Sequence, residues 1–301
     1  MSPNLRDTIR KELIKNREYT KFSDYYKFYV HDICENLIGG KMSDEHKMMF
    51  DEASGSELKD RFVPAKAKAI DSSSILSYNF FRHVNEKCTI EIDGVTYNKV
   101  FFEVQLKTLP ESNKPANIDV ALVSKDEKKV LFIESKFLEF LELGSDELSN
   151  SYKDIKNFYN DNEEIEELFE MSENFTSEKN RYNYGIKQNI CHLIGISNLN
   201  KSETAKKWFE KKYKDSPTVK ILNADSYRFM NIIFSPSNER AKEMCEAYIK
   251  HLSSLQESLP PKMKQYIGET FIMTYRKLYD IIPVEKDVKE ELFKRYIYFH
   301  S

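Results

Sequence analysis

The segment 118–137, IDVALVSKDEKKVLFIESKF, constrains the fold of this chain more than any other stretch. Two apolar runs flank the charged turn SKDEKK, and each run carries a carboxylate, Asp119 in the first and Glu134 in the second. Side chains alternate between the two faces of a strand, and here both faces of both runs are largely apolar. We therefore expect a central antiparallel pair of strands in a sheet that helices cover on both sides.

The two carboxylates fall opposite each other in the simplest register of this hairpin. Pairing Val123 with Val130 across the turn and continuing outward brings Asp119 opposite Glu134, and alternation places Lys136 on the same face. Like charges directly opposite each other destabilise a sheet by roughly 0.2–1 kcal/mol, and by more when desolvated. One lysine can offset one carboxylate. A divalent cation can offset both, because Mg²⁺ takes carboxylate, water and phosphate oxygens as ligands.

An ion pair on an edge strand is the alternative interpretation of these residues. The tripeptide acid-x-Lys is common, and in polar or helical surroundings it also occurs at Glu45–Lys47, Glu57–Lys59, Asp154–Lys156, Glu210–Lys212 and Asp287–Lys289. Glu134–Lys136 differs because it ends a strongly apolar run and has an acid at the matching position of the preceding run. We therefore favour a metal site over a structural salt bridge.

The pattern IDVAL followed by VLFIESKF resembles the active-site motif of the PD-(D/E)xK superfamily, the restriction-endonuclease-like nucleases, with Ile118 in place of the proline. The resemblance implies a metal-dependent deoxyribonuclease in which Asp119 and Glu134 are catalytic. Together with the backbone carbonyl of Ser135 they would bind Mg²⁺, for which Mn²⁺ could substitute. Lys136 would orient or activate the attacking water and stabilise the charge that grows on phosphate. Such a site hydrolyses DNA phosphodiester bonds, as restriction-like or repair-type endonucleases do.

The resemblance also implies an α/β fold: a restriction-endonuclease-like core made of a helix, a three-stranded antiparallel meander, a helix and a further strand, in a mixed sheet flanked by helices. We place this core at residues 71–236 of a single domain spanning 1–301, with helical additions at 1–70 and 237–301. Asp93-Gly94 between β-rich runs predicts a hairpin turn. Apolar spacing of three and four predicts helices at several places, namely near residues 5–16, 22–38, 72–84, 145–170, 182–196, 203–213, 239–252 and 263–282.

Three further polar residues are additional site candidates. Glu103 lies one strand upstream of Asp119 and is either a third acid near the metal or a solvent-facing strand acid. Gln188 and His192 follow Tyr184 at helical spacing, so they form one stripe. Some exonuclease-like members of the resembled family carry a glutamine in this place near the site. His192 is either a half-buried, satisfied histidine or a phosphate-contacting or proton-transferring group.

A serine cluster opens the helix that precedes the first strand. Ser72, Ser73 and Ser74 could hold phosphate at the helix N-terminus, but helix capping is the commoner role of such residues.

Composition and charge limit the partners and the location. With 46 basic and 49 acidic residues the net charge is −3, so contacts with DNA must come from local patches. The sequence has no signal-peptide pattern and no apolar stretch of membrane-spanning length, and its four cysteines form no CxxC pair, so we expect a cytoplasmic protein with no membrane association. The resemblance implies double-stranded DNA as partner and a homodimer as a frequent assembly.

Two competing hypotheses stay open. The first is a catalytically silent nucleic-acid-binding or protein-interaction module on the same fold. The second is an unrelated α/β interaction protein in which the hairpin acids are incidental. A module without activity has no need to keep Asp119, Glu134 and Lys136 together, which favours the nuclease.

Overall fold

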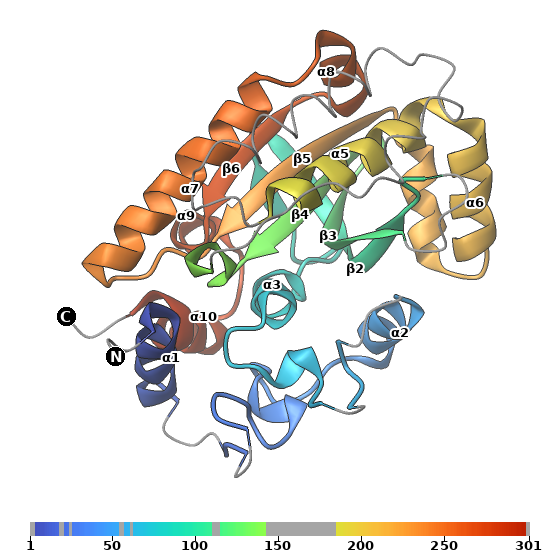
Figure 1. Cartoon of the computed structure of the whole chain (residues 1–301). Coiled ribbons are helices and arrows are strands. Elements are labelled where there is room, and N and C mark those ends of the chain that lie inside the picture. The colour runs from blue at the N-terminus through green and yellow to red at the C-terminus, as the bar shows by residue number, and fades with distance from the viewer. Residues whose placement is uncertain are drawn as a thin grey trace.

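The computed structural model describes residues 4–17, 21–23, 26–53, 57–60, 63–109, 115–142 and 185–298 (Figure 1). Within this part of the chain six strands form one sheet in the order β1-β2-β3-β4-β5-β6. Their bounds are β1 Ile90–Ile92, β2 Val95–Leu106, β3 Ala116–Ser124, β4 Lys129–Lys136, β5 Ser226–Ile233 and β6 Thr270–Thr274. Strands β1 to β4 are an antiparallel meander, and β5 and β6 continue it in parallel. The expected α/β class is confirmed.

Both predicted hairpins are present. Ile92 pairs with Val95 across Asp93-Gly94, and both turn residues have positive φ, at 49° and 71°, as a two-residue turn of this kind requires. The second hairpin pairs Val123 with Val130 and continues to Val120 with Ile133. The sequence-based register is therefore confirmed along the paired part of the β3–β4 hairpin.

Helices cover both faces of the sheet. The helices are α1 Leu5–Lys15, α2 Asp44–Glu52, α3 Ser73–Phe81, α5 Ile186–Lys201, α6 Glu203–Tyr213, α7 Glu239–Glu257, α8 Pro261–Ile267, α9 Tyr275–Ile281 and α10 Lys286–Leu292. Helix α5 meets Glu134 through His192, whereas α3 meets the neighbouring residue Ser135 through the Ser73 carbonyl. Because consecutive strand residues point to opposite faces, α5 and α3 lie on opposite sides of the sheet. We call these the α5 face and the α3 face.

The expected helix at residues 22–38 is wrong. This segment contains a short 3₁₀ helix at Ile33–Glu35 and isolated bridges, one of which joins Tyr29 to Ala69. Phe28 has a positive φ of 70°, which a continuing helix excludes. The backbone here instead bonds to the segment before α3, since Val30 N–H donates to the Lys68 carbonyl at 2.9 Å. Tertiary pairing thus overrides helical spacing.

The expected helix at residues 263–282 is also wrong as a single element. It divides into α8, strand β6 and α9, and Gly268 separates α8 from β6 with a φ of 65°. The run TFIMT pairs in parallel with β5, from Phe229 with Thr270 to Ile233 with Thr274. The sheet therefore continues past residue 236. The predicted helix at 145–170 lies outside the described residues.

The two ends of the described chain contact each other. The Asn16 amide at the end of α1 donates to the Tyr298 carbonyl at 2.8 Å, and Arg295 donates to the Glu35 carbonyl at 3.1 Å. Figure 1 shows α1 beside α10, below the sheet. Among the helices that the structure describes, none has the length and apolar character needed to cross a bilayer.

Close packing of α5 on β2 gives a first test. A Cβ at Gly195 would lie 2.6 Å from the Cβ of buried Leu106, so Gly195→Ala should destabilise the protein by about 1–3 kcal/mol despite the better helix propensity of alanine. Leu106→Gly in the same chain removes the Cβ that overlaps, so the two losses should be less than additive in a urea-denaturation cycle. A Gly195→Ala protein as stable as wild type would contradict this packing.

Candidate active site

A row of polar side chains crosses the sheet on the α5 face. The β3–β4 register ends at Val120 with Ile133, and the next residues outward on the two strands are Asp119 and Glu134. On the other neighbouring strand, Phe102 pairs with Val120 and Val104 pairs with Ile118. Glu103 of β2 therefore lies opposite Asp119 of β3. On the other side, Asn231 of β5 pairs with Glu134. Four neighbouring strands thus each contribute a polar residue to a row that crosses this face of the sheet.

Glu134 is the most firmly held of these carboxylates. Its Oε1 accepts a hydrogen bond from Lys136 Nζ at 2.6 Å, and its Oε2 lies 2.9 Å from His192 Nε2. All three side chains are buried. Burial alone would raise the pKa of Glu134, but the charges of Lys136 and His192 lower it to about 2. Glu134 is therefore ionised across the physiological range.

Lys136 is fixed from two sides. Its Nζ also donates to Gln188 Oε1 at 2.6 Å, so the ammonium lies between strand β4 and helix α5. Burial would lower the pKa of Lys136, but the neighbouring carboxylates, led by Glu134, raise it. Gln188 and His192 do form one stripe over β4, as expected, while Tyr184 lies outside the described residues. His192 is fully buried rather than half-buried.

Asp119 is held by the backbone of the facing strand. Its Oδ2 accepts from the Ser135 N–H at 2.7 Å. Because the N–H and C=O of one strand residue point to the same edge, the Ser135 carbonyl also faces the β3 side, where Asp119 lies. Burial and the charges of Glu134 and Glu103 raise the pKa of Asp119 well above its usual range. Two carboxylates and one carbonyl therefore converge here.

Glu103 is a buried strand acid, so the solvent-facing alternative is wrong. It is 5% exposed and has a positive φ of 52°, an uncommon conformation for a residue with a side chain. Burial and the charges of Glu57 and Glu134 raise the pKa of Glu103 well above its usual range. A glutamate with both backbone strain and an unfavourable charge environment is costly to keep, which is characteristic of functional sites.

These carboxylates fit a hard divalent cation in charge and in ligand type. Burial and neighbouring carboxylates raise the pKa values of Asp119 and Glu103, and a bound cation would favour their ionised forms. Oxygen ligands of this kind suit Mg²⁺, which commonly takes one or two carboxylates and completes its shell with water and phosphate oxygens. Within the described ranges, no group of three or more His, Cys, Asp or Glu residues forms a side-chain cage for a metal. The acids therefore offer an open cation site with few protein ligands.

The row opens into a cleft of about 740 Å³. Beside the predicted residues, its lining includes side chains from the N-terminal addition that the sequence analysis did not select: Arg6, Arg10, Glu57 and Lys66. The motif gave no signal for them because they approach the site only through tertiary contacts. Asn231, whose buried amide makes no hydrogen bond within the described part of the chain, was also missed. Its polar side chain within the apolar run FMNII was an available signal.

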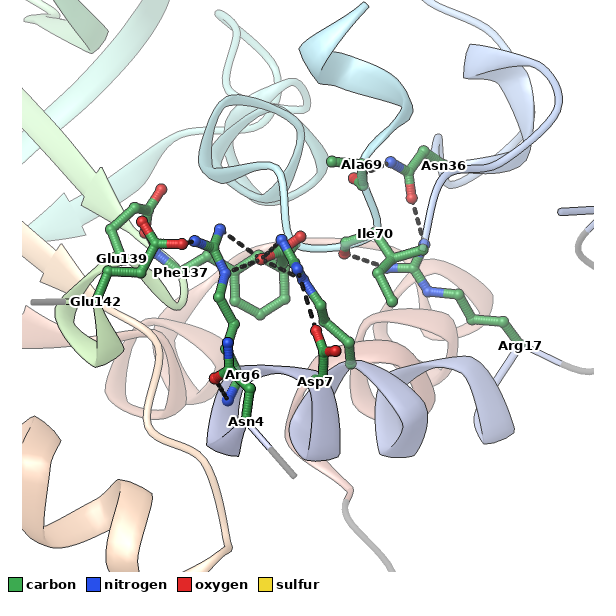
Figure 2. A network of polar contacts seen from close by, with 12 residues as sticks. Asn4, Arg6, Asp7, Arg17, Asn36, Ala69, Ile70, Phe137, Glu139 and Glu142 are labelled. Atoms are coloured by element: carbon green, nitrogen blue, oxygen red, sulfur yellow. Dashed lines mark hydrogen bonds and ion pairs between the residues drawn. The ribbon is translucent and has the colours of Figure 1, made fainter. Parts of the chain in front are cut away.

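Helix α1 is joined to the cleft wall through one buried carboxylate. Asp71 Oδ2 accepts from Arg6 Nε at 2.8 Å and from Arg10 Nε at 3.0 Å, and Arg6 also pairs with Glu142. Figure 2 shows this network, in which Arg6 extends from α1 to Glu142. The N-terminal addition is thus part of the cleft.

The serine cluster at the start of α3 has structural partners. Ser72 caps the helix, since its Oγ accepts from the Ile75 N–H at 3.3 Å, which confirms the capping role. Ser74 Oγ donates to Glu57 at 3.0 Å. The Ser73 carbonyl accepts from Ser135 Oγ at 3.1 Å, so α3 supports the strand residue that binds Asp119.

Comparison of the chain with protein-family models, with curated proteins and with solved structures finds no match.

The charge environment of Glu103 predicts a pH-dependent stability change. The folded protein holds the Glu103 proton more tightly than the unfolded chain, so stability falls as pH rises from the ordinary pKa near 4.5 towards the raised folded pKa. Glu103→Gln has no such proton and should be more stable than wild type by about 1–3 kcal/mol near pH 8, with a smaller gain near pH 5. Urea denaturation in EDTA measures the difference.

Glu91→Gln, on exposed Glu91 of β1, is the matched control for loss of a strand carboxylate. A Glu103→Gln protein less stable than wild type at high pH would show that Glu103 has a stabilising partner.

Proposed function

We propose that this chain is a divalent-metal-dependent nuclease that hydrolyses DNA phosphodiester bonds, as a restriction-like or repair-type endonuclease. The observation that carries the proposal is the convergence of Asp119, Glu134 and Lys136 on one face of a buried hairpin, at the wall of a cleft. The element order α3, antiparallel β2-β3-β4, α5 and parallel β5 agrees with the core that the PD-(D/E)xK resemblance implies. DNA as partner, a homodimer and a cytoplasmic location belong to the same proposal.

The proposed cation would be held by Asp119, Glu134 and the Ser135 carbonyl. When bound, Mg²⁺ supplies Lewis-acid stabilisation of the phosphate charge and lowers the pKa of bound water. Lys136 has three ammonium donors, of which two are used by Glu134 and Gln188, so one is left for an oxygen of the reacting phosphodiester or for the attacking water. Fixed donors of this kind stabilise developing charge without reorganisation.

Gln188 and His192 act as positioning residues in this proposal. Gln188 restricts Lys136 from α5, and His192 restricts the Glu134 carboxylate from one helical turn further along. Neither needs to contact the phosphate to affect the rate, because misplacement of Lys136 or Glu134 weakens transition-state contacts.

A nuclease assay tests the proposed chemistry. Supercoiled, linear and single-stranded DNA should be cut in Mg²⁺ or Mn²⁺, and Asp119→Asn and Lys136→Met should each lower the rate by about a hundredfold or more. Lys129→Met, at the exposed opposite end of β4, is the matched control and should cut like wild type. If wild type cuts no substrate, or the site variants cut equally well, the proposal fails.

Lys136→Met leaves the buried Glu134 carboxylate without its lysine partner, so this variant could unfold. Circular dichroism should therefore check its folding alongside the assay. If it unfolds, the double variant Glu134→Gln/Lys136→Met removes both charges of the pair. The double variant should be folded and inactive.

Metal binding can be measured without substrate. A cation that binds the folded state alone raises stability, by about 2.7 kcal/mol at a hundredfold excess over its Kd. Thermal unfolding of wild type should therefore shift upward with Mg²⁺, whereas Asp119→Asn should show little shift. An equal shift in the two proteins would place the cation elsewhere.

A further inference from the structure

A salt bridge from the N-terminal addition lies on the wall of the candidate active cleft. Lys66 Nζ donates to Glu57 Oε1 at 2.9 Å, and both residues line the cleft together with Asp119, Glu134 and Lys136. Lys66 begins a 3₁₀ helix, Lys66–Lys68, and precedes the nuclease-like core in sequence. The acid–lysine motif therefore does not account for this pair.

The carboxylate of this pair is fixed, whereas its lysine is largely exposed. Glu57 Oε2 accepts from Ser74 of α3 at 3.0 Å, and the Glu57 carbonyl accepts from the Ala67 N–H at 2.9 Å. The Glu57 side chain is 12% exposed, but that of Lys66 is 67% exposed. An exposed ion pair is worth about 0–1 kcal/mol, so Lys66 can share its ammonium with another anion at little cost.

Three of the other cations that line the cleft, Arg6, Arg10 and Lys136, are already engaged. Arg6 and Arg10 both bond to Asp71, and Lys136 bonds to Glu134 and Gln188. The Lys66 ammonium donates one hydrogen bond to Glu57, so its remaining N–H donors are open to another anion. Among the described lining residues, acidic side chains outnumber basic ones, so a polyanion needs such a donor near the acids in order to enter.

Electrostatics place Lys66 within the field of the active-site acids. Partial desolvation at the cleft wall would lower the pKa of Lys66, but the hydrogen bond to Glu57 and the charges of Glu57, Glu103 and Asp119 raise it. Lys66 in turn lowers the pKa of Glu103. The ammonium is therefore charged at neutral pH, and it lines the same cleft as Glu103 and Asp119.

We propose that Lys66 binds a backbone phosphate of the nucleic acid next to the scissile one, and that Glu57 is a positioning residue that holds its ammonium at the cleft wall. This inference rests on the proposed nuclease function for the identity of the substrate. It assigns the N-terminal addition a direct part in substrate binding.

The test measures DNA binding separately from cleavage. An Asp119→Asn background prevents cutting, and a labelled short duplex and its single strand are titrated in Ca²⁺ at several salt concentrations. Lys66→Met should weaken binding about tenfold, the effect of losing one charged hydrogen bond. It should also reduce the slope of log K against log salt by about 0.9 for the duplex or about 0.7 for the single strand.

Two matched variants make the result specific. Lys68 lies two residues further along and pairs with Asp60 at 2.6 Å, away from the cleft lining, so Lys68→Met should change neither affinity nor slope. Glu57→Gln keeps a group that Ser74 can bond but removes the charge that competes with phosphate. It should bind DNA a few-fold more tightly than the background protein.

Equal slopes for Lys66→Met and the background protein, or no DNA binding at all, would overturn the inference. If wild-type protein cuts DNA while Lys66→Met changes nothing, the nuclease proposal stands without it. If wild type never cuts but the slope still depends on Lys66, the phosphate contact stands and the nuclease proposal fails.

Discussion

The pairing of β3 with β4 determines the geometry of the whole candidate site. Because side chains alternate, a slip of one residue in this register would send Asp119 and Glu134 to opposite faces. The apolar pairs from Val123–Val130 to Val120–Ile133 oppose that slip, since a slip would exchange side chains between two closely packed faces and bury a carboxylate on the α3 face. Burial of the hairpin thus sets the distance between two carboxylates that would otherwise repel each other.

The α3 face keeps the acids of the α5 face in place. Ser135 lies between Glu134 and Lys136 in sequence, so its side chain points to the α3 face while its backbone N–H bonds to Asp119. There its hydroxyl bonds to the Ser73 carbonyl and to Tyr275, which begins α9. Both helices therefore restrain the middle residue of the acid-x-Lys motif. The C-terminal part of the chain contributes to this support, and its strand β6 extends the same sheet.

Local sequence patterns predicted the parts of the fold that depend on neighbours in the chain. The two hairpins, helix α3, helix α6 and the register around the acids follow from alternation, turn residues and apolar spacing. The convergence of Gln188 and His192 on β4 was also predictable, because spacing of four puts both on one side of a helix. Segments 22–38 and 263–282 were misjudged because their backbones pair with distant strands or loops, and a helical pattern contains no information about such partners.

The cleft residues that the sequence did not reveal were missed for the same reason, because they reach the cleft through distant contacts. Glu57 and Lys66 occur in a polar stretch where charged residues are expected on any surface. Their role depends on the Glu57–Ser74 bond, which joins this stretch to α3, and on the contact of Arg6 and Arg10 with Asp71, which brings α1 to the same wall. No local period reveals either contact, so the boundary drawn at residue 70 separated parts that form one cleft.

The row of polar residues is difficult to explain as a stabilising feature. A buried ion pair such as Glu134–Lys136 often does no better than apolar residues of the same size, and Glu103 and Asp119 add two further carboxyl groups whose ionised forms are disfavoured by burial and by their acidic neighbours. Asn231 extends the row with a buried amide that has no hydrogen-bond partner among the described residues, and an unpaired buried amide costs further stability. A chain that could place apolar side chains at all four positions keeps polar ones instead. The positions are next to one another and line or border one cleft, so selection for a ligand at this place explains them better than selection for stability.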